Sequence, residues 1–102
     1  MIKDYLSMCI SNTSINSLIS LPDLVFNNYC RDSYRINRGI YNTIEAWFYK
    51  NGYIDILERR RKILRFLEAH KHRAEKNGKL RFGRGNLVPH LEDFEYTEVQ
   101  GG

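Results

Sequence analysis

Apolar side chains recur every third or fourth residue along most of this 102-residue chain, which is the spacing of a helix that buries one face. The longest such pattern covers about residues 55–76, where Ile63 and Leu67 lie on the side expected to be buried. Shorter helical patterns come before it, separated by residues that favour caps and turns, at 2–10, 15–19, 22–39 and 40–50. We therefore predict a mainly α fold: a small domain of four to five helices with one long helix at about residues 55–76.

The pattern changes after this long helix. Residues 77–86 contain three glycines, and we expect them to form a flexible loop. From Phe94 to Val99 apolar and polar residues alternate, which indicates an extended C-terminal tail with a possible short strand. The sequence thus predicts a helical domain at 1–78, followed at 79–102 by a basic, glycine-containing loop and an acidic tail.

Positive charge is concentrated in one segment. Residues 59–84 carry eleven Lys and Arg against two acids, a net charge of +9, whereas the whole chain has a formal charge of +4. Residues 85–102 carry four acids and no Lys or Arg. The long helix is therefore basic, and a field of this kind attracts polyanions or acidic protein surfaces. The acidic tail is a candidate to fold over this helix as an internal competitor.

The basic positions form three groups of candidate binding residues. The first group lies along the long helix and comprises Arg59, Arg61, Lys62, Arg65, His72 and Lys76. The second group is in the loop and comprises Lys79, Arg81, Phe82 and Arg84. Arginine and phenylalanine interleaved with glycine suit single-strand binding, because guanidinium groups meet phosphates and a ring stacks on a base. The third group is the row Arg31, Arg35 and Arg38, whose spacing puts them on one face of a helix.

Each group also has a simpler interpretation. The helix cations can be an ordinary solvated surface, and Phe82 can pack into the core. The arginine row can pair with Asp32 or with the acidic tail.

The sequence carries no catalytic or metal-binding signature. His70 and His72 point to opposite sides of a helix, so the two rings cannot hold one metal ion together. No glycine-rich segment has the spacing of a phosphate-binding loop. We therefore predict no catalytic residue, no metal site, no cofactor and no enzyme, with a small nuclease as the alternative.

The cysteines and the apolar runs indicate the compartment. Cys9 and Cys30 are too far apart for a redox or zinc pair, and they suggest free thiols in a reducing compartment. No apolar stretch approaches the length of a membrane span or a signal peptide. We expect a cytoplasmic protein with no membrane contact, in the host cytoplasm if the chain is viral.

Two functions fit these patterns best. The leading hypothesis is a nucleic-acid-binding module, with RNA or single strands favoured, that uses the basic helix face and the Arg/Phe/Gly loop. The alternative is a small protein-binding inhibitor or assembly factor, of the phage or viral accessory type, that docks its basic helix on an acidic partner surface. The long amphipathic helix also allows a homodimer.

Overall fold

The computed structural model describes residues 12–78, 82 and 85–101, and most of these belong to five helices. The helices are α2 (Asn12–Ile19), α3 (Asp23–Tyr34), α4 (Arg38–Lys50), α5 (Ile56–Asn77) and α6 (Leu87–Gly101). The residues that the structure describes form no strand. The predicted mainly α fold and the long helix are confirmed.

Local sequence explains where the helices begin and end. The Asp55 side chain accepts a hydrogen bond of 3.0 Å from the backbone N–H of Glu58, which caps the start of α5. Gly78 ends α5 in the left-handed conformation, with φ of 87°. Asn37 caps α4 in the same way as Asp55 caps α5, by accepting a 2.8 Å bond from the N–H of Ile40.

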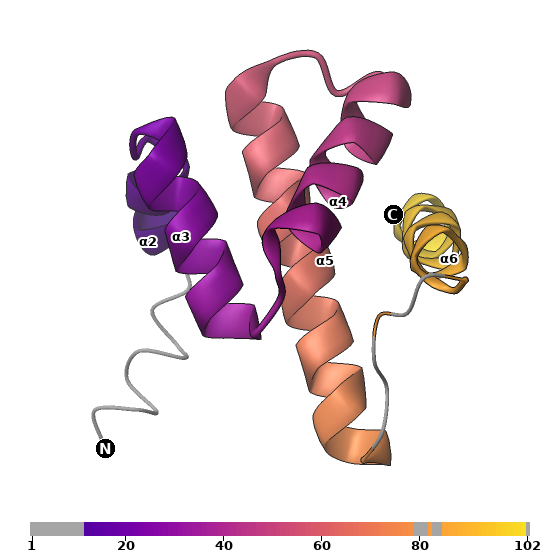
Figure 1. Ribbon diagram of the computed structural model, residues 1–102. Helices are drawn as coiled ribbons and strands as arrows, with labels where there is room; N and C mark the ends of the chain where they lie inside the picture. The colour runs from indigo at the N-terminus through magenta and orange to yellow at the C-terminus, as the bar shows by residue number, and fades with distance from the viewer. Residues whose placement is uncertain (1–11, 79–81, 83–84, 102) are drawn as a thin grey trace.

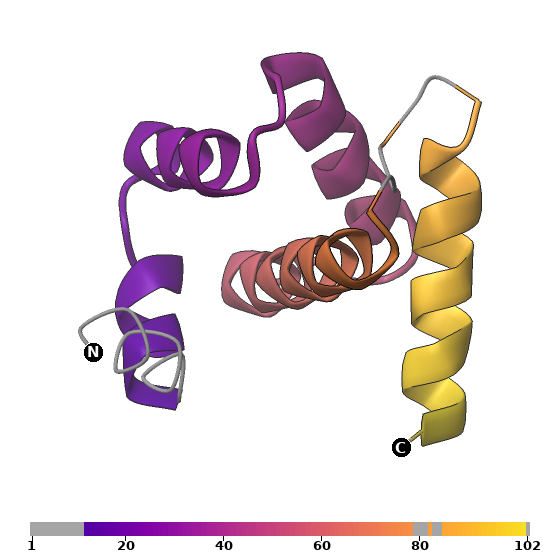
Figure 2. The same cartoon turned by 90° about the horizontal axis from the view of Figure 1, so that it is seen from below.

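The other helices surround α5. Figure 1 shows α5 running the height of the molecule beside α3 and α4. Figure 2 looks nearly along α5 and shows α2 on one side of it, α6 on the other, and α3 and α4 across the top. The aromatic core lies where three of the helices meet: Phe48 of α4, Phe66 of α5 and Phe94 of α6 pack edge to face, with ring centroids 5.5–6.4 Å apart.

The predicted extended C-terminal tail is wrong, because residues 87–101 form the helix α6. Leu87, Leu91 and Phe94 are spaced by four and three residues, and all three are buried on one face of α6. Pro89 does not break the helix because it falls in the first turn, where backbone N–H groups have no partner within the helix. The alternation from Phe94 to Val99 was therefore misleading. Along the described residues, no helix is long and apolar enough to cross a membrane.

Candidate nucleic-acid interface

Arg59, the first cation of the positive segment at residues 59–84, is buried in the fold. Arg59 is only 8% exposed. Its guanidinium donates hydrogen bonds to the backbone oxygens of Tyr53 and Ile54, at 2.9 and 2.8 Å, and lies 3.3 Å from a carboxylate oxygen of Glu45. These contacts hold the connection between α4 and α5, so Arg59 presents little charge to a ligand.

Arg60 has a similar position on the other side of α5. It is 7% exposed and donates to the backbone oxygens of Ile19 and Leu21, at 2.8 and 2.6 Å. It also pairs with the exposed carboxylate of Asp23, and its guanidinium carbon lies 4.8 Å from the ring centroid of Phe26. Arg60 therefore ties the corner between α2 and α3 to α5.

The next cations on α5 meet the acidic helix α6. Lys62 Nζ lies 2.7 Å from Glu98 Oε1, and Arg65 Nη1 lies 3.5 Å from the same oxygen. Burial lowers the pKa of Lys62, but the hydrogen bond and charge of Glu98 outweigh it, so the net pKa is raised. Arg61 lies on the α2 side of α5, where it donates to the Asn16 side-chain oxygen at 3.1 Å.

A hollow of about 710 Å³ lies on α5 between α2 and α6. Arg65, His72 and Arg73 line it together with Glu68 and Glu98. Because both signs of charge are present, and Arg73 also pairs with Asp93 at 3.2 Å, this hollow has a mixed charge.

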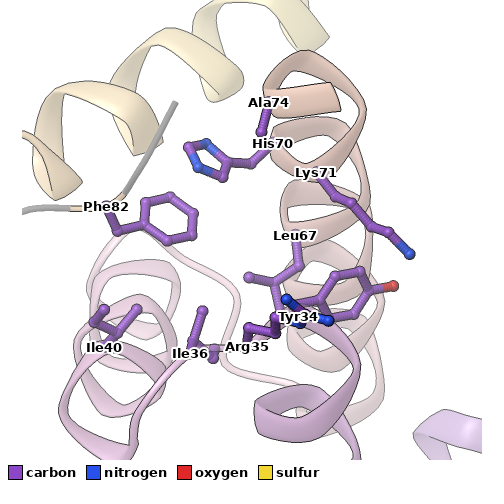
Figure 3. A pocket seen from close by; sticks show the side chains of 9 residues that line it. All are labelled: Tyr34, Arg35, Ile36, Ile40, Leu67, His70, Lys71, Ala74 and Phe82. Atoms are coloured by element: carbon purple, nitrogen blue, oxygen red, sulfur yellow. The ribbon is translucent and has the colours of Figure 1, made fainter. Parts of the chain in front are cut away.

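A second cavity, of about 430 Å³, lies where α3 ends, α4 begins and the second half of α5 passes. Figure 3 shows its wall and floor. The rings of Phe82 and His70 stack with centroids 3.7 Å apart and planes 18° apart, and Arg35 and Lys71 also line the cavity. Phe82 is half-buried and packs against the core residue Phe66, so it serves both the core and this cavity.

The structure contradicts the prediction that Arg31, Arg35 and Arg38 share one helix face. Because Asn37 caps a new helix, α3 ends at Tyr34, and residues 35–37 form a turn. Arg31 therefore lies on α3, Arg35 in the turn and Arg38 at the start of α4, and the three do not share one helix face. Arg31 donates to side-chain oxygens of its neighbours on α3, whereas the side chains of Arg35 and Arg38 are exposed.

The remaining candidates are placed as follows. Both His72 and Lys76 are exposed on the second half of α5. Lys79, Arg81 and Arg84 lie outside the described residues. Across the described segments, no three His, Cys, Asp or Glu side chains are grouped so that they could hold a metal ion.

Two residues that line the second cavity were not predicted from the sequence. Lys71 and His70 were not among the candidates, although a signal for them exists. Leu67, His70, Lys71 and Ala74 are spaced by three, one and three residues, and such spacing puts an apolar pair, an imidazole and an ammonium group on one face of α5.

Comparison with known proteins gives one finding about function. No protein-family model and no solved structure matches this chain. The chain is 40% identical over 84 residues to the RNA-binding riboflavin kinase RibR of Bacillus subtilis strain 168. The match covers 80% of this chain and 36% of RibR, so the chain spans about a third of the relative's length.

This similarity overturns the prediction of no enzyme, because the matched relative is itself a kinase. The prediction relied on the absence of catalytic motifs from 102 residues, and that absence carries no information about a longer enzyme that contains a related segment.

Proposed function

We propose that this chain is an RNA-binding module. The observation that carries the proposal is its 40% identity to part of a relative described as RNA-binding. The charge distribution supports the same conclusion, because the positive segment retains exposed cations after its buried members are discounted.

The exposed cations suggest where RNA would bind. Four of them form no ion pair within the described ranges and lie around the turn between α3 and α4 and the second half of α5: Arg35, Arg38, Lys71 and Lys76. These elements come together at the lower end of the molecule in Figure 1. We propose this end as the RNA-binding surface, with phosphates as its main contacts.

The test is fluorescence anisotropy with a labelled single-stranded RNA of about ten nucleotides and with its duplex. About four phosphate contacts on a single strand give a log–log salt slope near −3, which is roughly a fifty-fold loss of affinity between 50 and 200 mM salt. Replacing Lys71 and Lys76 by Gln together is expected to weaken binding about tenfold or more.

The matched control removes two charges at the opposite end of the molecule, in Lys50→Gln with Arg61→Gln. This control variant is expected to bind RNA like the wild type. A wild-type protein that binds neither strand form at 50 mM salt would overturn the proposal, and equal losses in both double variants would overturn the choice of surface.

A protein partner is the second candidate function, and an exposed apolar corner favours it. Ile54, Ile56 and Leu57, next to each other at the start of α5, are 41–60% exposed. Such a cluster suits a protein contact, and it lies far along α5 from the proposed RNA surface. Its occupant can be a separate protein or a second copy of this chain. The predicted cytoplasmic location is compatible with either function.

A further inference from the structure

We propose that the cavity beside Phe82 takes one unpaired base of the bound RNA, while Arg35 and Lys71 contact phosphates next to that base. This inference rests on the proposed function and identifies which part of the RNA enters the protein. The cavity volume of about 430 Å³ lies within the usual range of small-ligand sites, about 300–1,000 Å³.

The lining of the cavity fits the flat face of a base. The stacked rings of Phe82 and His70 form an aromatic wall, and Ile36, Ile40 and Leu67 supply apolar surface. Bases stack on aromatic rings in most proteins that bind single strands, and this stacking tolerates any sequence because every base has a π-face. A base pair inside a duplex cannot present its face in this way.

The charges at the cavity fit the backbone that carries such a base. Arg35 and Lys71 are exposed, and Figure 3 shows the Lys71 ammonium extending over Tyr34 at the side of the cavity. Lys71 Nζ lies 5.8 Å from the Tyr34 ring centroid, and the Tyr34 hydroxyl donates a 2.6 Å hydrogen bond to Glu68. Because Lys71 is exposed, its ammonium group can reach a phosphate.

The backbone conformation at Arg35 makes arginine an unusual residue for this helix end. Arg35 has φ of 53° and ψ of 48°, and it has the one positive φ among the described non-glycine residues. Glycine is the usual residue at such a helix end, because a side chain is disfavoured there. Unlike glycine, Arg35 carries a guanidinium at this position, and this group can contact a phosphate.

The other large hollow is a poorer site for an RNA strand. The hollow between α2 and α6 contains the carboxylates of Glu68 and Glu98, which repel phosphates. At the cavity beside Phe82, by contrast, the charged side chains that line it are Arg35 and Lys71.

The test uses a single-stranded RNA of about ten nucleotides that contains one 2-aminopurine, whose fluorescence is quenched when it stacks on a ring. Binding of the wild-type protein is expected to quench this fluorescence and to favour the single strand over its duplex. Phe82→Leu is expected to remove the quenching and to weaken single-strand binding about five- to a hundredfold, the range for losing one stacked base. The ring-loss control, Tyr96→Leu on the exposed face of α6, is expected to change neither quantity.

Arg35→Gly separates the ligand contact from the fold. Glycine suits the left-handed conformation, so this variant is expected to keep or raise the melting temperature while it weakens RNA binding about tenfold. Lys50→Gln removes one charge at the far end of α4 and is the matched control. If the wild-type protein binds RNA without quenching, or if Phe82→Leu and Arg35→Gly both bind RNA like their controls, the inference is overturned and the proposed function stands. If the wild-type protein binds no RNA, both fall.

Discussion

Replacing the buried Arg60 by Met tests whether this arginine is part of the fold and not of a binding surface. Met keeps most of the apolar stem but removes the guanidinium. The backbone oxygens of Ile19 and Leu21 would then lose charged donors that now lie 2.8 and 2.6 Å away. A hydrogen bond from a charged group contributes about 1.5–3 kcal/mol, and a buried acceptor left without a donor is costly.

The size of the loss follows from these contacts. The pair with Asp23 adds little, because that carboxylate is 85% exposed and an ion pair in water is weak. The two oxygens can regain some solvent, so we expect a net loss of about 3 kcal/mol, close to the lower bound for two such bonds. For a domain of this size, that loss is a large share of the total stability.

Urea unfolding followed by the fluorescence of Trp47, the single tryptophan, measures this loss. With a slope of about 1–3 kcal/mol per molar urea, the midpoint is expected to fall by about 1–3 M. The control is Arg65→Met, because the Arg65 side chain is 55% exposed and its loss is expected to cost less than about 0.5 kcal/mol. Equal midpoints for the two variants would refute the assignment of Arg60 to the core.

Three further predictions concern the core, α6 and pH. Phe48→Ala is expected to cost about 3–5 kcal/mol in unfolding free energy, and Trp47→Ala less, because Phe48 is fully buried whereas Trp47 is half-buried; urea melts followed by circular dichroism rank them. Glu98→Gln frees two cations of α5 that lie outside the proposed RNA surface, so RNA affinity at low salt, measured by anisotropy, is expected to stay nearly unchanged; a several-fold tightening would show that RNA binds along α6 instead. Burial raises the pKa of the Cys30 thiol from its ordinary value of 9.0 to about 12, so its contribution to stability is complete well below pH 9, where the thiol is protonated in both the folded and the unfolded state, and is lost as pH rises towards 12. Melts at rising pH are therefore expected to show falling stability, with a shallower fall in Cys30→Ala.

The sequence predicted those parts of the fold that depend on local signals. The long helix α5 was found because its period, its cap at Asp55 and its end at Gly78 all agree. The turn after α3 was not predicted because an asparagine such as Asn37 can lie inside a helix or cap the start of a new one. Only the packing of the helices selects the cap. The end of the chain was misread because Phe94 to Val99 fits two periods at once, and the burial of Leu91 selects the helical one.

The candidate site was harder to predict than the fold. The four adjacent cations at residues 59–62 point in directions that span a wide arc around the helix. Periodicity alone does not predict which of these side chains a neighbouring helix will bury. Arg59 and Arg60 are buried because backbone oxygens of the two flanking connections point at them. The cavity beside Phe82 draws on α3, α4, α5 and Phe82 itself, and segments so far apart in the chain are brought together only by the tertiary fold.

The contact between α5 and α6 has a consequence for the thermodynamics of RNA binding. Glu98 and Asp93 already neutralise Lys62, Arg65 and Arg73, so α6 acts as a covalently attached counterion. Cations that are already paired within the protein make no phosphate contact, so they release no counterions from the RNA. The salt dependence of binding should therefore be shallower than the number of basic residues in 59–84 implies.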